Sequence, residues 1–203
     1  MSIPFQDSET AKNLLRAFAG ESQARNRYDF AANLCQKQEL QAMAFIFQAT
    51  AKQEQAHAKV FWDHLQALNG QNLPIYGAYP IEGTNRILEL LRAAQHNEHE
   101  EHGSVYPSFA AIATQEGFPE AAASFRQITA IEQLHGERFG LLADQLESGA
   151  LFVSQIETGW MCLNCGHTQN SLEAPKQCPV CNHGQGWFIR LELAPWSPVV
   201  KQT

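Results

Sequence analysis

The sequence has little basic charge and no long apolar run. Lys and Arg number 14 against 21 Asp and Glu, and the formal net charge is −7. A nucleic-acid-binding surface needs a surplus of Lys and Arg to neutralise phosphates, so we expect no nucleic-acid partner. No stretch approaches the roughly 18 apolar residues of a membrane-spanning helix, and the opening MSIPFQDSET lacks the basic and apolar regions of a secretory signal. We therefore expect a cytoplasmic protein without a membrane partner.

Cysteine is scarce outside one short segment. Four of the five cysteines form two pairs, Cys162-x-x-Cys165 and Cys178-x-x-Cys181, separated by the segment 166–177. In a cytosolic chain this spacing indicates a metal site rather than disulfides. Four thiolates bind either iron or zinc, and the spacing alone does not exclude a structural zinc site. The fifth cysteine, Cys35, lies on a predicted core stripe, where we expect it to act as a small apolar side chain.

Proline is absent from residues 5–73, where apolar residues recur at spacings of three, four and seven. This periodicity predicts two long helices, about 8–35 and 38–68, because such residues share one face of a helix. Asp7 or Ser8 is suited to cap the first helix.

The connection that follows, residues 69–84, contains two Pro and three Gly and is not helical. A connection of this length suits a crossover between two helical hairpins, as in ferritin-like bundles. Thr84 is predicted to cap a third helix, which Pro107 should kink. Pro119 is suited to begin a fourth helix that ends near Ser148.

The predicted fold is therefore mainly α, with two domains. Residues 1–148 form a ferritin-like four-helix bundle with a long crossover. Residues 149–203 are rich in aromatic and β-branched residues broken by turn residues, and we expect a small β-rich module there. A module of this size has too small a core to be stable alone, and a metal on its four cysteines stabilises it.

One motif occurs twice on the apolar stripes of the bundle. Glu54-x-x-His57 is repeated as Glu132-x-x-His135. A Glu and a His three residues apart lie about one turn apart on the same helix face, so both side chains reach one point. Each motif is therefore a candidate half of a metal site.

A further glutamate precedes each motif by one helix length. The separation between Glu21 and Glu54 nearly equals that between Glu98 and Glu132. A Glu from each of two helices plus Glu-x-x-His from each of two others is the ligand set of di-iron and di-manganese bundle proteins. Glu101 adds a fifth carboxylate on the stripe of Glu98. Buried carboxylates without a partner cost several kcal/mol each, so the pattern predicts two bound metal cations rather than a row of surface acids.

The chain resembles a rubrerythrin from end to end. The matching stretches are AFAGESQARNRY, EQAH, EHEEHGSVYP and EQLHGERF in the helices, and WMCLNCGH with CPVC in the tail. The resemblance implies a di-iron bundle followed by a rubredoxin-like domain with one iron on four cysteines. It also implies reduction of hydrogen peroxide to water, in oxidative-stress defence. The electrons would come from an NAD(P)H-dependent reductase or a rubredoxin and pass through the four-cysteine iron.

The resemblance further implies a role for each ligand of the di-iron site. Glu54 and Glu132 match the carboxylates that bridge the two irons. Glu21 and Glu98 match terminal ligands, one to the first iron and one to the second.

The remaining positions follow in the same way. His135 matches a ligand of the second iron, while His57 and Glu101 match residues that alternate on the first. Tyr28 and Tyr106 match tyrosines that hydrogen-bond to ligating carboxylates.

The sequence leaves alternatives to this function. A ferritin-like ferroxidase or iron-storage protein uses a similar ligand set, but it needs no attached electron carrier. An oxygen-reducing oxidase uses the same metals, and the sequence does not separate it from a peroxidase. His102 is either a neighbour of the ligands or a bulky wall residue, whereas His96 and His99 are expected to face solvent.

The tail is expected to serve a second subunit. His135 lies about 11 residues before the predicted end of its helix at Leu146, which is about 16 Å along the axis. The segment 147–161 then separates Leu146 from Cys162. The four-cysteine iron therefore starts far from its own di-iron site, so we expect a head-to-tail homodimer. The alternative is a tail that folds back on its own bundle.

Overall fold

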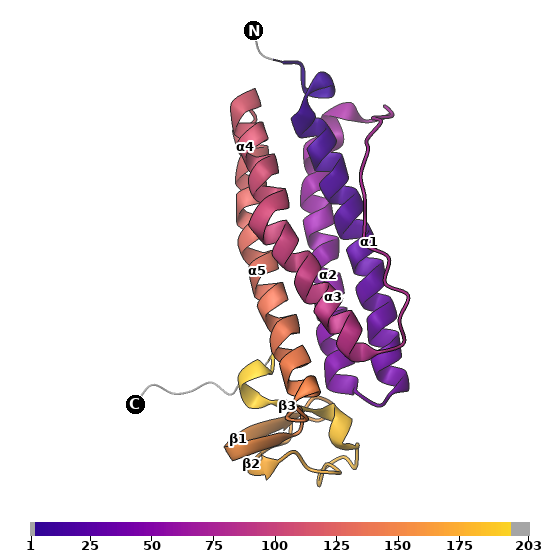
Figure 1. Cartoon of the computed structure of the whole chain (residues 1–203), viewed down its shortest axis with the longest axis vertical. Coiled ribbons are helices and arrows are strands. Elements are labelled where there is room, and N and C mark those ends of the chain that lie inside the picture. The colour runs from indigo at the N-terminus through magenta and orange to yellow at the C-terminus, as the bar shows by residue number, and fades with distance from the viewer. Residues whose placement is uncertain (1–2, 196–203) are drawn as a thin grey trace, which may run out of the picture.

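The computed structural model describes residues 3–195 as a long helical bundle with a small sheet at one end (Figure 1). Helices α1 (Glu9–Lys37) and α2 (Gln41–His64) form the first antiparallel hairpin. A 3-10 turn, Leu65–Leu68, extends α2 to its predicted end. Ser8 rather than Asp7 caps α1, because the Ser8 hydroxyl accepts a hydrogen bond from the N–H of Ala11.

A second hairpin packs on the first. It consists of α3 (Ile87–Glu100), a π-helical segment (Glu101–Val105), α4 (Tyr106–Glu116) and α5 (Pro119–Glu147). Between the hairpins, residues 69–86 run the length of α1 without helix or strand (Figure 1). The structure therefore confirms a ferritin-like four-helix bundle with a long crossover.

The third helix of the bundle differs from the sequence prediction in two details. Thr84 does not cap it: the last residue before α3 is Arg86, whose N–H donates to the Thr84 hydroxyl. The sequence predicts a disturbance of the helix at Pro107, and the structure has a π-helical segment just before this proline. There the Tyr106 N–H donates to the carbonyl of Glu101, five residues back. Such a segment places an extra residue in the turn and changes which face the following residues occupy.

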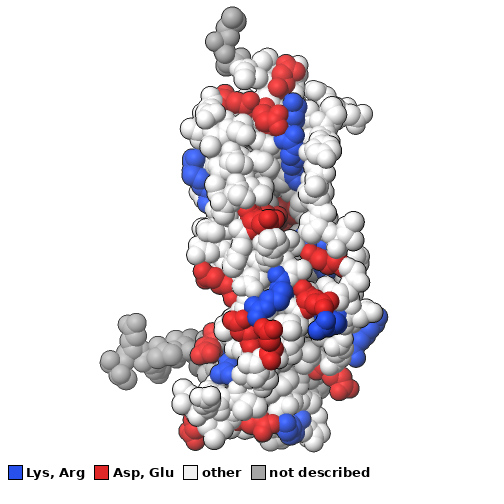
Figure 2. Space-filling view, in the orientation of Figure 1, with Lys and Arg blue, Asp and Glu red and all other residues white. Residues whose placement is uncertain are grey.

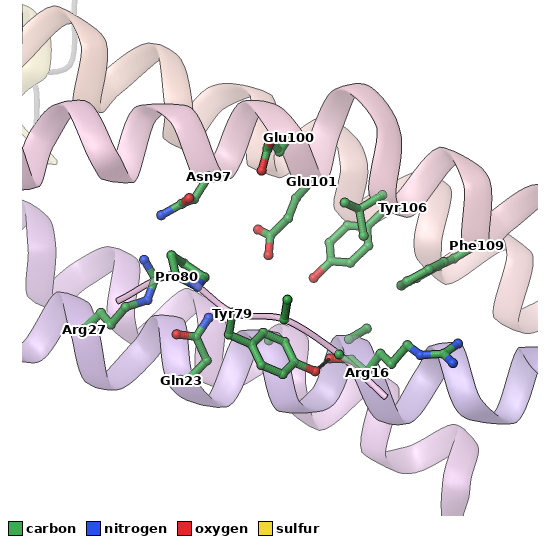
Figure 3. Close-up of a pocket in the computed structure, with 15 residues that line it drawn as sticks. Arg16, Gln23, Arg27, Tyr79, Pro80, Asn97, Glu100, Glu101, Tyr106 and Phe109 are labelled. Atoms are coloured by element: carbon green, nitrogen blue, oxygen red, sulfur yellow. Dashed lines mark hydrogen bonds between the residues drawn. The ribbon is translucent and has the colours of Figure 1, made fainter. Parts of the chain in front are cut away.

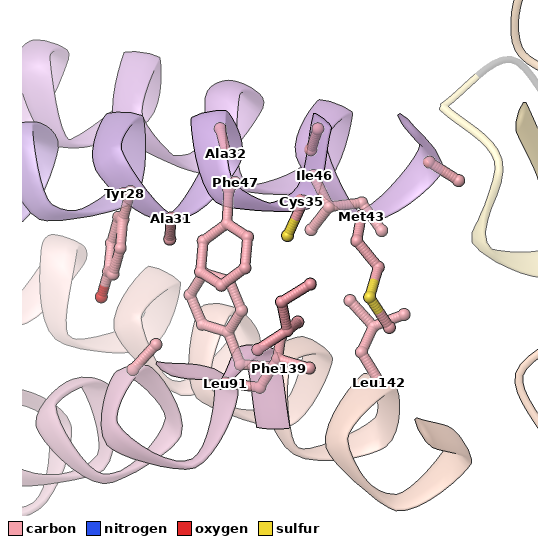
Figure 4. Close-up of a cluster of buried hydrophobic side chains, with 14 of the residues drawn as sticks. Tyr28, Ala31, Ala32, Cys35, Met43, Ile46, Phe47, Leu91, Phe139 and Leu142 are labelled. Carbon is pink, nitrogen blue, oxygen red and sulfur yellow. The ribbon is translucent and has the colours of Figure 1, made fainter. Parts of the chain in front are cut away.

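Each Glu-x-x-His motif lies between two buried phenylalanines. Phe47 and Phe61 flank the motif on α2, and Phe125 and Phe139 flank the motif on α5. The four rings pair across the bundle: Phe47 with Phe139 and Phe61 with Phe125, with 5.0 Å between ring centroids in both pairs. Two apolar clusters thus lie on either side of the acidic centre, and Figure 4 shows the one nearer the sheet. That cluster includes the fully buried Cys35, as expected.

The tail forms a three-stranded antiparallel sheet in the order β2-β1-β3. Its strands are β1 (Val153–Cys162), β2 (Thr168–Glu173) and β3 (Phe188–Arg190). The tail's own buried cluster is small: Trp160, Cys162, Ala174, Cys178 and Phe188. A core of this size agrees with the need for a metal to stabilise the module.

The sheet also packs against the end of its own bundle. Met161 and Ile189 belong to the same apolar cluster as Phe47 and Phe139. Tail and bundle therefore share one continuous core where they meet.

Gly186 marks the closest approach between tail and bundle. A Cβ built on this residue would lie 1.7 Å from the carbonyl oxygen of Glu39 and 2.9 Å from its carbonyl carbon. Glu39 itself lies in the turn between α1 and α2, with a φ of 60°. No side chain fits between these two backbones, so the contact requires glycine.

Charged side chains of both signs are interspersed on the face of the molecule in Figure 2, and its described residues form no continuous basic area there. This distribution agrees with the net charge of −7. Within residues 3–195, no helix has the length and apolar character needed to cross a membrane.

Candidate metal centres

The first cluster of metal-ligating side chains is Glu21, Glu54, His57 and Glu132. Their donor atoms all lie within 4.8 Å of one another. Nδ1 of His57 is 3.0 Å from Glu54 Oε2 and 3.0 Å from Glu132 Oε1. The same nitrogen is 3.8 Å from Glu21 Oε2. One imidazole and three carboxylates thus converge on one point.

The second cluster is Glu54, Glu98, Glu132 and His135, again within 4.8 Å. Nδ1 of His135 is 3.0 Å from Glu54 Oε1 and 2.9 Å from Glu132 Oε2. Glu98 Oε2 lies 3.5 Å from this nitrogen. Glu54 and Glu132 therefore belong to both clusters, and each directs one oxygen to one histidine and the other oxygen to the other.

The carboxylates of both clusters are buried, and several of their oxygens lack a hydrogen-bond partner. The four glutamates of the two clusters are at most 1% exposed. Within the described chain, the atoms without a hydrogen-bond partner include Glu21 Oε2, Glu54 Oε1, Glu98 Oε2, both Glu132 oxygens and His135 Nδ1. Buried carboxylates in this state are strongly destabilising unless cations compensate them. The arrangement therefore fits two metal ions, and oxygen with imidazole ligands suits iron.

Burial and mutual interaction shift the pKa values of the cluster. Burial raises the pKa of Glu98 to about 8 and that of Glu21 well above its ordinary value. Burial also opposes ionisation of Glu54, but the close pairing with His135 and His57 outweighs it and lowers that pKa to about 2. For both histidines, hydrogen bonds to the glutamates outweigh burial and raise the pKa, that of His135 to about 12. Protons thus balance the carboxylates where metals would, and metal binding releases them.

Two tyrosines form hydrogen bonds with the outer carboxylates. The hydroxyl of Tyr28 donates to Glu98 Oε1, and that of Tyr106 donates to Glu21 Oε1. Both tyrosines are at most 2% exposed. Because each hydroxyl uses one carboxylate oxygen, the other oxygen is left to face the cluster.

Gln53 is a site residue that the sequence analysis missed. Its Oε1 lies 2.9 Å from Nε2 of His135. A hydrogen bond from Nε2–H to this amide oxygen leaves Nδ1 as the metal-facing nitrogen and fixes the ring. Gln53 precedes Glu54 directly, but no periodicity predicts a contact with a residue 82 positions away.

The four cysteines of the tail also come together. Their Sγ atoms lie within 4.8 Å of one another, with 3.7 Å between Cys162 and Cys181 and 3.6 Å between Cys165 and Cys178. A tetrahedron with metal–sulfur bonds of about 2.3 Å has edges of about 3.8 Å, so the geometry fits one tetrahedral ion.

Two similar backbone turns present these thiols. The Cys162 N–H donates to the His167 carbonyl, and the Cys178 N–H donates to the His183 carbonyl, at 2.8 Å in both cases. Each turn is closed by a residue with positive φ, which is Gly166 at 75° in the first turn and Asn182 at 61° in the second. The repeated Cys-x-x-Cys pairs thus form two matching halves of one site.

Comparison with known proteins places this geometry in a family. The family model Rubrerythrin matches residues 12–143, and the model Rubrerythrin, rubredoxin-like domain matches residues 160–189. A rubrerythrin of Porphyromonas gingivalis is 43% identical over 188 residues, which cover 93% of this chain and 92% of that protein. The chain belongs to the rubrerythrin family. A rubrerythrin of Nitratidesulfovibrio vulgaris is 39% identical over 186 residues, with 92% of this chain and 96% of that protein covered.

Solved structures agree with the fold of this rubrerythrin. A fully reduced, all-ferrous nigerythrin is 25% identical, with a TM-score of 0.61 over 94% of this chain and 88% of that one. A bacterioferritin of Mycobacterium tuberculosis shares the fold at 18% identity and a TM-score of 0.61, over 70% of this chain and 88% of that one. The rubrerythrin therefore holds a di-iron carboxylate-histidine site in a ferritin-like bundle and a rubredoxin-like four-cysteine iron site in its tail. The predicted domain boundary at residue 148 lies between the two matched ranges and stays a prediction.

Glu101 is the predicted site residue that the structure leaves outside both clusters of this rubrerythrin. Its carboxylate points into a cavity between α1 and the π-helical segment (Figure 3). Burial and the neighbouring carboxylates raise its pKa well above the ordinary value. The structure thus has the arrangement in which His57 rather than Glu101 joins the first cluster.

The other histidines near the rubrerythrin site have separate roles. Nδ1 of His102 lies 3.0 Å from the carbonyl oxygen of Thr129 on α5, so this ring links the π-helical segment to α5. His96 and His99 are exposed, as expected.

Proposed function

We propose that this rubrerythrin is a peroxidase that reduces hydrogen peroxide to water in oxidative-stress defence. Its electrons come from an NAD(P)H-dependent reductase or a rubredoxin and pass through the four-cysteine iron to the di-iron site. The observation that carries the proposal is the presence of two different metal sites on one chain. An iron-storage protein needs no attached electron carrier, so the tail favours reduction of a substrate over storage.

Within this proposal, Glu54 and Glu132 would each contribute one oxygen to either metal site. The support is their shared membership of both clusters, with one oxygen directed to each histidine. Glu21 is then a terminal ligand of the first iron and Glu98 of the second, and His135 completes the second.

When bound, two irons held by these residues would supply the two electrons that reduction of a peroxide to water requires. The chain's contribution is to fix the ligands in advance. Tyr28 and Tyr106 orient the outer carboxylates, and Gln53 orients His135. The members of the two clusters are at most 6% exposed, which limits their contact with bulk water.

Glu101 gives the two irons unequal surroundings. It lies three residues after Glu98, whereas Ala24 lies three residues after Glu21. Ferric iron is the harder ion and prefers a carboxylate, while ferrous iron tolerates imidazole better. Our hypothesis is that Glu101 replaces His57 beside Glu21 when the site is oxidised.

We expect Glu101→Ala to retain two irons, because neither four-residue cluster includes Glu101. Its second-order rate with hydrogen peroxide should fall by about ten-fold or more, equivalent to about 1.4 kcal/mol on the barrier. Metal analysis and stopped-flow absorption measure the two quantities, and Glu137→Ala, which changes an exposed acid on α5, is the control. Crystal structures of both oxidation states with identical ligands beside Glu21 would exclude the exchange.

The reaction with peroxide is the direct test of the proposed function. We expect the chemically reduced protein to react at least about ten-fold faster with hydrogen peroxide than with oxygen, a barrier difference of about 1.4 kcal/mol. Stopped-flow mixing of one protein sample with each oxidant gives the two rates. Oxygen reacting as fast or faster would favour the oxidase alternative instead.

A further inference from the structure

A cavity of about 270 Å³ lies beside the di-iron site, between α1, the crossover and the π-helical segment (Figure 3). Its wall includes Glu101 and Tyr106, whose hydroxyl donates to Glu21. The cavity is far larger than the ~10–15 Å³ that one water needs. Four other hollows among the described residues are lined by no member of the seven-residue ligand set. This cavity therefore reaches the seven-residue set at Glu101.

The crossover forms one side of the cavity and is tied to α1. The Tyr79 hydroxyl donates to the Arg16 carbonyl at 2.9 Å, and Arg16 Nε donates to the Tyr76 carbonyl at 2.9 Å. Further along, Arg27 pairs with Glu82 at 2.6 Å, with both side chains at most 14% exposed. These bonds hold the Tyr79 ring over the cavity.

Gly20 of α1 lies between this ring and the carboxylate. A Cβ built there would be 3.6 Å from Tyr79 Cε1 and 3.9 Å from Glu101 Oε1. Glycine is unfavourable inside a helix, and this position has helical backbone that any residue adopts. What glycine provides here is therefore space in the passage.

We propose that this cavity is the entrance to the di-iron site and that Gly20 and Tyr79 limit it to small peroxides. The identity of the substrate rests on the proposed function. Glu101, Tyr106 and Arg27 add polar groups to a wall that is otherwise largely apolar, a combination that suits a small polar molecule. A bulky alkyl hydroperoxide has to displace the Tyr79 ring to reach the same point.

Two sets of variants test the entrance. Gly20→Ala and Gly20→Leu add increasing bulk to the passage, and both residues favour helix. Tyr79→Ala removes the ring, and Tyr76→Ala is the matched control, because Tyr76 lies three residues away on the crossover and is 87% exposed. The probes are azide binding to the oxidised protein, followed by its charge-transfer absorption, and oxidation of the reduced protein by hydrogen peroxide and by cumene hydroperoxide.

We expect azide association to slow in the order wild type, Gly20→Ala, Gly20→Leu, by about ten-fold for Leu, which corresponds to about 1.4 kcal/mol on the barrier. Tyr79→Ala should speed the reaction with cumene hydroperoxide by a similar factor, with iron content unchanged in every variant. Tyr76→Ala should alter neither rate.

Unchanged azide and cumene hydroperoxide rates in the iron-loaded Gly20 and Tyr79 variants would contradict the proposal that this cavity is the entrance. The proposed function is tested separately by the wild-type protein. If wild type fails to react with hydrogen peroxide while azide association still depends on Gly20, the entrance stands and the peroxidase assignment falls.

Discussion

Two inactive variants of this rubrerythrin should regain activity when they share a dimer. Cys165→Ala/Cys178→Ala removes two thiolates of the four-cysteine site, and Glu54→Ala/Glu132→Ala removes the two carboxylates that belong to both clusters of the di-iron site. Each variant alone is expected to lose reductase-driven peroxide turnover completely. If each tail delivers electrons to the partner's bundle, a mixed dimer contains one intact pair of sites and recovers turnover.

The reason lies in the position of the tail. It packs at the end of its own bundle (Figure 1), while His135 lies about 12 residues before the end of α5 at Glu147, or about 18 Å along the axis. A head-to-tail partner brings a second tail beside the middle of the bundle. The measurement is NADH oxidation by co-refolded mixtures, with each variant refolded alone as the control. Mixed dimers that form, hold both metals and stay inactive would establish that each tail serves its own bundle.

Gly186→Ala should have the second large effect, by breaking the joint between tail and bundle. Its Cβ would lie 1.7 Å from the Glu39 carbonyl oxygen, a distance that backbone atoms cannot accept without moving apart. We expect reductase-driven turnover to fall by about ten-fold or more, equivalent to about 1.4 kcal/mol on the barrier. Direct oxidation of the chemically reduced di-iron site by peroxide should stay unchanged, because the ligands lie within the bundle.

Gly184→Ala is the matched control for this experiment. Gly184 lies two residues away, has a φ of −68°, and a Cβ added to it would meet nothing within 4 Å. Wild-type turnover in Gly184→Ala together with a loss in Gly186→Ala would assign the effect to the contact with Glu39. Equal turnover in both variants would show that electron delivery does not need the contact between Gly186 of the tail and Glu39 of the bundle.

The sequence places the members of each Glu-x-x-His motif together because helical periodicity is a property of neighbouring residues. The Glu-x-x-His spacing places Glu54 with His57, and Glu132 with His135, on one helix face each, and the structure brings both faces together. The same reasoning cannot find Gln53, because its contact with His135 depends on how two helices are packed side by side.

Helical periodicity also fails to predict the π-helical segment. Sequence analysis places Glu101 on the stripe of Glu98 by assuming regular α-helix, and Pro107 signals only that the helix is disturbed nearby. The hydrogen bond from Tyr106 to the Glu101 carbonyl shows that the disturbance begins at Glu101 itself. Glu101 itself keeps the α-helical phase of Glu98, because its N–H donates to the carbonyl of Asn97, four residues back. The residues whose helix face changes are those that follow it, and the sequence pattern gives no sign of that change.

The joint at Gly186 also bears on how electrons move. Two backbones in direct contact leave the tail no room to swing, and shared apolar packing through Met161 and Ile189 restrains it further. The four-cysteine site then keeps one position relative to the bundle and does not move between an electron donor and an acceptor. Under the proposed function, we expect electrons to leave this site by tunnelling over a fixed distance, with a rate that does not depend on the viscosity of the solvent.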